Sequence, residues 1–340
     1  MNRRTRRTLL VVLAVLLLLA VAIFLRSKAP PEAARLLPES DGILYVNLRP
    51  MRTFFHKEVK PPERVPEYQQ FVDATGVDWE RDLDQAAIGL HRMQDPRGPN
   101  GPVAYSLVLV GKLTGPHLKD WLESHAASRE IYAGHTIYNL PSEDRTVRVV
   151  QIGYDMIAVS NYPTPEKIHS IIDRHRTAAL PFAGSTLLSQ HYHEVPLLSL
   201  AWGVGQIGLP FNESGAISIF GFQLPLQSDS TIVASIAPEL SLGAALRLRV
   251  EEIAPTDQAA AEQAQNLNAL VLLARGYTAP LSDSAANQGL KELLKTAEIS
   301  QTRNRVLIRA TLPASFLAGL SSAEKISAEP ATPAANSASN

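Results

Sequence analysis

The sequence predicts an α+β protein: an N-terminal transmembrane helix, then a body of two weakly similar halves with mainly antiparallel sheets packed by helices. Three observations support this. Residues 9–25 form an unbroken apolar run, and many short β-branched or alternating segments follow one another without helices between them. The order of strands and helices in residues 37–186 also recurs in residues 187–320. This order favours sheets covered by helices on one face over a doubly wound parallel sheet.

The apolar run is long enough to cross a bilayer. As an α-helix, its 17 residues (9–25) span about 26 Å, against a hydrocarbon thickness of about 30 Å. Four arginines precede the run and two basic residues follow it. Because the more basic flank stays cytoplasmic, we predict a bacterial inner-membrane anchor with the body exported. A cleaved signal peptide is the competing interpretation, but the run is long for one, and Pro30 follows the best cleavage motif, Ser27-Lys28-Ala29.

Charge separates the N-terminal segment from the rest of the chain. Residues 1–28 carry a net charge of +6, whereas residues 29–340 carry −7. An acidic body without a dense Lys/Arg stripe repels phosphate backbones, so we expect no nucleic-acid partner. The chain has no cysteine, which excludes disulfides, thiolate metal sites, a catalytic thiol and a lipid anchor on cysteine.

Short segments frame the body. Residues 1–8 are expected to be a basic cytoplasmic tail, and residues 26–36 a stiff linker, because Pro30-Pro31 favours extended backbone. Residues 321–340 consist almost wholly of Ser, Ala, Pro, Asn, Glu and Thr. Such a composition cannot bury enough apolar surface to offset the entropy of ordering, so we predict a disordered C-terminal tail.

A weak internal repeat defines the two halves. The first half is expected to contain a helix and four corresponding strands, at 115–126 and at 43–48, 86–92, 105–113 and 156–160. In the second half the matching helix and strands are expected at 256–275 and at 197–202, 231–237, 242–251 and 304–311. Gly276 is the expected C-terminal cap of the second helix.

The segment His191–Gly208 contains the patterns closest to a functional site. Gly203, Gly205 and Gly208 have the G-x-G-x-x-G spacing of a dinucleotide-binding loop. No helix is predicted after them, and without a helix N-terminus nothing holds a pyrophosphate. We therefore expect a glycine-rich loop after a strand, and no cofactor.

His191 and His193 are candidate zinc ligands. On a strand they would share one face and could both reach one metal ion, with Glu194 pointing away. The sequence shows no second cluster of metal-binding residues and no H-E-x-x-H pattern. We therefore favour a polar turn between the two halves, with no metal site and catalytic residues unknown.

Other patterns add little. His125 and His175 each lie in the last turn of an expected helix, where a histidine interacts with free carbonyl groups. Neither a G-x-S-x-G nucleophile elbow nor a G-x-x-x-x-G-K-[ST] phosphate loop occurs.

Two segments resemble bacterial envelope proteins of domain-of-unknown-function type: LLPESDGILYVNL over residues 36–48 and GVDWERDLD over residues 76–84. The resemblance implies an anchored, exported α+β body and brings no catalytic residues with it.

These observations predict a membrane-anchored exported protein that is a non-enzymatic binding or structural module of the envelope. Its expected partners are the lipid bilayer, through residues 9–25, and another envelope protein. The alternative is an envelope metal-dependent hydrolase that uses His191 and His193. A third hypothesis is a binder of small apolar ligands between sheet and helices.

Overall fold

A computed structural model describes most of the body of the 340-residue chain: residue 12 and residues 29–55, 65–98, 100–113, 115–142, 145–177, 184–206, 216–219, 222–225, 230–239, 245–278 and 285–313. Among these residues, no helix is both long and apolar enough to cross a membrane. The predicted span 9–25 lies outside the described residues except for Val12. The two predicted tails, 1–8 and 321–340, also lie outside them.

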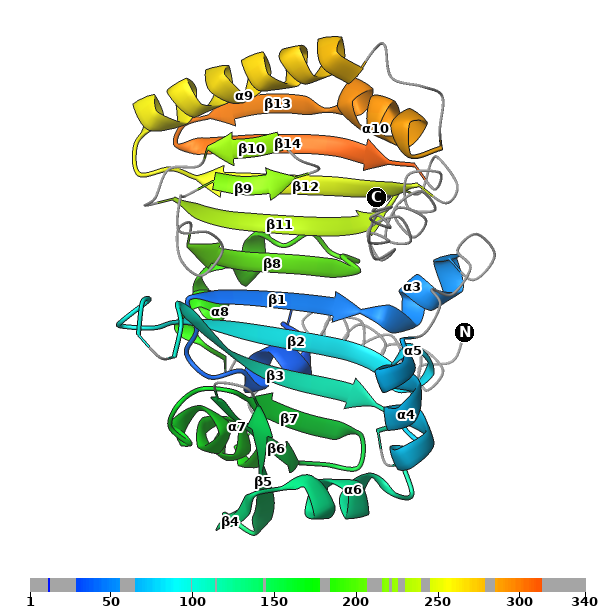
Figure 1. The fold of residues 1–340 in the computed structure, drawn as a ribbon. Helices are drawn as coiled ribbons and strands as arrows, with labels where there is room; N and C mark the ends of the chain where they lie inside the picture. Colours follow the sequence, from blue (N-terminus) through cyan, green and yellow to red (C-terminus); the bar gives the residue numbers. More distant parts are fainter. Residues whose placement is uncertain are drawn as a thin grey trace, which may run out of the picture.

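One twelve-stranded sheet runs through the molecule, in the order β13-β14-β12-β11-β8-β1-β2-β3-β7-β6-β5-β4 (Figure 1). All of its strand pairs are antiparallel, which confirms the predicted α+β class. The strands are β1 Gly42–Asn47, β2 Leu83–Arg92, β3 Val103–Gly111, β4 Ser128–Tyr132, β5 His135–Ser142, β6 Arg145–Gln151, β7 Met156–Ser160, β8 Ala201–Gln206, β11 Thr231–Pro238, β12 Leu246–Ile253, β13 Glu298–Thr302 and β14 Arg305–Leu312. A separate hairpin consists of β9 Ala216–Ile219 and β10 Phe222–Pro225.

Helices connect and cover the strands. They are α2 Glu32–Leu36, α3 Leu48–Phe55, α4 Pro66–Thr75, α5 Trp79–Asp82, α6 Leu118–His125, α7 Glu166–Arg176, α8 Thr186–His191, the 3-10 helix η1 Tyr192–Glu194, α9 Asp257–Thr278 and α10 Ala285–Thr296. Helix α9 continues past Gly276, so the predicted cap at that residue was wrong. Gly276 does not have the positive φ that a glycine adopts at such a cap.

The two halves meet at the centre of the sheet, where β1 pairs with β8. Outward from this pair the order is β1-β2-β3-β7 on one side and β8-β11-β12-β14 on the other. This is the strand-by-strand correspondence expected from the repeat. The first half then adds the β4–β6 strands, whereas the second adds β13 alone.

Helices cover both faces of the sheet. On one, the α7 face, α2, α7 and α8 pack over residues that include Val108 and Val204. On the other, the α6 face, α6 packs over Leu109 and Ile157, and α9 packs over Val306. The expectation of helices on one face was wrong, because the strands carry apolar side chains on both sides of the pleat.

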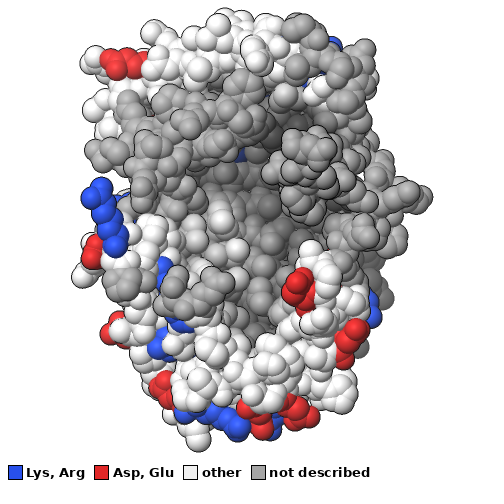
Figure 2. Space-filling view, in the orientation of Figure 1, with Lys and Arg blue, Asp and Glu red and all other residues white. Residues whose placement is uncertain are grey.

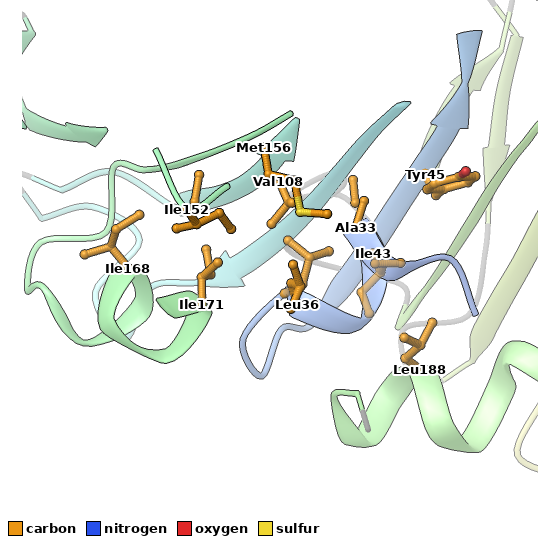
Figure 3. Packing of buried hydrophobic residues seen from close by; sticks show 14 of the residues in the cluster. Ala33, Leu36, Ile43, Tyr45, Val108, Ile152, Met156, Ile168, Ile171 and Leu188 are labelled. Atoms are coloured by element: carbon orange, nitrogen blue, oxygen red, sulfur yellow. The ribbon is translucent and has the colours of Figure 1, made fainter. Parts of the chain in front are cut away.

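The largest core cluster of the described residues lies on the α7 face and extends from the first half to Trp202 and Val204 of β8 (Figure 3). Ile168 and Ile171 of α7 are fully buried, and Ala33 and Leu36 of α2 lie in the same cluster. Each buried large aliphatic side chain stabilises the fold by about 1.5–3 kcal/mol. Residues 32–36 are thus not part of an extended linker, because they form α2 and its apolar face is part of the core.

Candidate functional site

The connection from α8 to β8 crosses the centre of the sheet, where the two halves meet. After η1, a turn over Pro196–Ser199 leads into β8, which begins at Ala201. Ser199 closes this turn, because its backbone N–H and its Oγ donate to the Pro196 carbonyl at 3.4 and 2.7 Å. The strand expected at 197–202 was therefore placed too early, since the turn occupies its first positions.

The glycines of the G-x-G-x-x-G pattern lie in a strand, not in a loop after one. Gly203 and Gly205 belong to β8 and pair with β1 and β11, while Gly208 lies outside the described residues. A Cβ atom at Gly203 would lie 2.7 Å from Cδ2 of Leu44, so the packing of two central strands explains this glycine. The expected glycine-rich loop was wrong at these two positions.

His191 and His193 lie on helical backbone rather than on a strand. His191 ends α8 and His193 is in η1, so side chains two positions apart point in different directions. His193 Nε2 lies 3.0 Å from Oε1 of Glu194, an oxygen that also accepts a hydrogen bond from Arg305. Within the described part of the chain, no group of three His, Cys, Asp or Glu residues could hold a metal ion.

Four charged side chains connect η1 to β12 and β14. Arg305 donates to Glu194 and to Glu251, at 2.8 Å each, and Arg249 donates to Glu251 at 2.6 Å. The two glutamate side chains are only 14% and 7% exposed. The hydrogen bond from Arg305 holds the pKa of Glu194 below its usual value, and both carboxylates raise the pKa of Arg305. This ion-pair network fixes the connection to the second half.

An aromatic pocket of about 140 Å³ lies on the α7 face beside this connection. Tyr45 and Trp202, opposite each other on β1 and β8, stack with ring centroids 5.4 Å apart. Tyr192 of η1 meets Trp202 edge to face, also at 5.4 Å. Burial raises the pKa of both tyrosines, and Tyr192 adds to the effect on Tyr45, so both hydroxyls are neutral at physiological pH. The pocket thus presents neutral aromatic surface.

The rim of the aromatic pocket is apolar and exposed. Leu197 and Leu198 of the turn are 51% and 76% exposed. Leu198 has a left-handed φ of 67°, a conformation that costs an L-residue about 1–2 kcal/mol. Pro31, which directly precedes α2, also lines the pocket. The arrangement can accept an apolar side chain.

A second polar cluster, the His91 chain, spans β2, β3 and β7 under α2 and α7. His91 Nε2 lies 2.8 Å from Ser106 Oγ, which lies 3.1 Å from Ser160 Oγ. A serine beside a neutral imidazole is the pairing that activates a nucleophile. Here, however, all three side chains are at most 2% exposed, so a substrate cannot reach Ser106 in this structure. The His91 chain is therefore a buried network that links three strands.

Burial dominates the titration of His91. It lowers the pKa of His91 to about 4, and the charge of Lys167 acts in the same direction, while a backbone hydrogen bond with Glu39 partly offsets both. Among the other histidines, Nδ1 of His125 lies 2.8 Å from the Trp121 carbonyl, a contact of the kind expected at a helix end.

Comparison with known proteins gives only distant structural similarity. No protein-family model matches the chain, and no curated protein matches it. Among solved structures, crystal form I of TP0453 has a TM-score of 0.43 and 13% identity, covering 87% of this chain and 98% of that one. Crystal form III of TP0453 has a TM-score of 0.43 and 12% identity, covering 86% and 99%. Similarity at this level supports no functional assignment.

Proposed function

We propose that this chain is a single-span envelope protein with an exported, non-enzymatic body that binds another protein. The observation that carries the proposal is the apolar run 9–25 with its arginine-rich leading flank. The start of the body supports it. The basic segment that follows the apolar run ends at Lys28. Only three residues, 29–31, separate it from α2, whose Ala33 and Leu36 are buried in the core. A tether at this point would hold the body close to the bilayer.

The binding surface in this proposal is the turn with Leu197 and Leu198, together with the aromatic pocket that it borders. Apolar and aromatic residues that meet in a pocket are the anchoring points of protein interfaces. A strained Leu198 that is 76% exposed contributes little to the fold of the isolated body. Contact with an apolar side chain of a partner would remove this leucine from water.

The charged surface also favours a protein partner over a nucleic acid. In Figure 2, basic and acidic side chains are interspersed along the lower part of the described surface. Recognition of a phosphate backbone requires basic residues gathered into a stripe. Mixed charge of this kind suits the polar rim of a protein interface.

Site-specific photocrosslinking in intact cells tests the binding surface. A photoreactive residue replaces Leu198 in one full-length variant and Tyr154, which is 94% exposed and away from the pocket, in a matched control. We expect a discrete adduct with one envelope protein from position 198 and none from position 154. Equal labelling from both positions, or none from position 198, would contradict the proposed binding surface.

A further inference from the structure

The aromatic pocket has the composition of a surface that binds proline-rich segments. Tyr45, Tyr192 and Trp202 line it together with two prolines, Pro31 and Pro196. Segments with the pattern P-x-x-P bind to aromatic-lined grooves as a polyproline II helix, which is extended before binding and therefore loses little entropy. The volume of about 140 Å³ admits one small side chain at a time. A proline ring is a suitable occupant.

Two side chains of the pocket have hydrogen-bonding groups that the described protein leaves unused. Asn47 lies on the same face of β1 as Tyr45, and Tyr192 is the first residue of η1. Both line the pocket. Among the described residues, neither the Asn47 amide nor the Tyr192 hydroxyl has a hydrogen-bond partner. Because a polyproline II helix has no internal backbone hydrogen bonds, its carbonyl groups can accept from both side chains.

The chain itself contains a P-x-x-P pattern, Pro330-Ala331-Thr332-Pro333, near its C-terminus. These four residues lie outside the described part of the chain. Proline restricts its own φ to the polyproline II value, and it restricts the preceding residue to extended backbone. In a polyproline II helix, with three residues per turn, the two prolines would lie on one face about 9 Å apart. The sequence therefore favours the conformation that such a pocket binds.

The pattern is within reach of the pocket. Pairing with β12 and β11 places Leu312 at the end of the sheet where β8 begins. Three strand spacings, about 14 Å, separate β14 from β8. Sixteen residues, 314–329, connect Pro313 to Pro330 and can extend to at most about 53 Å. Such a connection gives an effective concentration on the order of millimolar, so a weak contact can still be well populated.

We propose that residues 330–333 bind in the aromatic pocket of their own chain and cover the Leu197–Leu198 surface until a partner displaces them. One proline occupies the pocket, and the other packs against Leu198, which is otherwise 76% exposed. The inference rests on the proposed function, because it names the chemistry that this surface recognises. It adds that the chain regulates access to the surface with a segment of its own.

Paramagnetic relaxation enhancement in the full-length chain, in non-ionic detergent, tests this contact. The chain has no cysteine and three tryptophans. Ala334→Cys therefore carries a single nitroxide label beside the P-x-x-P pattern, and 5-fluorotryptophan gives three fluorine resonances. Trp202 lines the pocket, whereas Trp121 packs in the cluster on the α6 face and serves as an internal control.

Two further variants of the labelled chain separate the prolines from the rest of the segment. Pro330→Ala/Pro333→Ala removes both rings, and Thr332→Ala is the matched control, because it changes the same segment and keeps both prolines. We expect the nitroxide to cause a loss of Trp202 intensity and no loss of Trp121 intensity. The double proline variant should recover the Trp202 intensity, and Thr332→Ala should not.

A mixture of two chains identifies the occupant. One chain carries the nitroxide and no fluorine, and the other carries fluorine and no nitroxide. We expect no loss of Trp202 intensity in the mixture, because the segment binds its own chain. A loss there equal to that in the doubly labelled chain would assign the segment to a second copy and overturn the proposal.

Three other results would overturn the assignment: no loss at Trp202, equal loss at Trp202 and Trp121, or a loss that persists in the double proline variant. The proposed function has a separate test in the crosslinking at Leu198. An adduct with an envelope protein but no tail contact would remove this inference alone. A tail contact without any adduct would remove the proposed partner and leave the contact within the chain.

Discussion

Buried His91 should make the protein lose stability as the pH falls from neutrality towards 4. Its pKa is about 4 in the folded state, against an ordinary value of 6.5. Between these values the unfolded chain binds a proton that the folded chain excludes, so stability is complete above about pH 6.5 and declines below it. The full difference corresponds to about 3 kcal/mol, of which about 2 kcal/mol is lost by pH 5. Solvent screening does not reduce this free energy, because the His91 side chain is only 2% exposed.

Urea unfolding of the full chain in non-ionic detergent measures this effect, with tryptophan fluorescence as the signal. Carboxylates also titrate at low pH, so the informative quantity is the difference between wild type and His91→Gln, in which the amide retains hydrogen-bonding groups but does not titrate. We expect the free energy of unfolding to fall between about pH 7.5 and pH 5 by about 2 kcal/mol more in the wild type than in the variant. Parallel declines in both proteins would refute the reasoning.

Three further predictions concern β8 and the connection that precedes it. Gly203→Val places a side chain where a Cβ would lie 2.7 Å from a leucine of β1, so we expect a loss of about 1–3 kcal/mol in the same urea assay; an unchanged midpoint would speak against close packing there. Arg305→Ala removes the arginine partner of Glu194 and leaves Glu251 with Arg249 alone. Because the Arg305 side chain is 38% exposed, we expect a loss smaller than the roughly 3–5 kcal/mol of a fully buried pair. As a control, Arg247→Ala breaks an ion pair with Glu239 in which the arginine is 52% exposed and should cost about 0–1 kcal/mol. Equal losses in the two variants would contradict a special role of the network around Arg305. Elemental analysis should find no stoichiometric zinc in the purified chain; zinc that disappears in the His191→Ala/His193→Ala variant would instead favour the hydrolase.

Strands were predictable where their pattern was local. In β3, alternate residues such as Ala104, Ser106 and Val108 are buried while their neighbours are partly exposed, and this periodicity is visible in the sequence. The start of β8 was not predictable from its apolar content, because Leu197 and Leu198 are as apolar as strand residues but form a turn. Helix α2 was missed because two prolines precede it and its five residues are too few to show a helical period.

The candidate sites were less predictable, because their residues are far apart in the chain. Glu194 and Arg305 are separated by 111 positions, and only the pairing of β12 with β14 brings Arg305 beside Glu251. His91 gave no pattern in the sequence, since its partners are serines on other strands. The histidine pair at 191 and 193 was a candidate zinc site in the sequence. That hypothesis depended on a strand geometry that the helical backbone does not provide.

The central claim is that residues 9–25 anchor the chain with its body outside the cytoplasm, and reporter fusions after residue 320 test it most directly. One fusion carries alkaline phosphatase, which is active only after export, and its matched counterpart carries a fluorescent protein that matures only in the cytoplasm. The account predicts high phosphatase activity in the inner-membrane fraction and no fluorescence. A fluorescent, phosphatase-inactive chain recovered in the soluble fraction would contradict it.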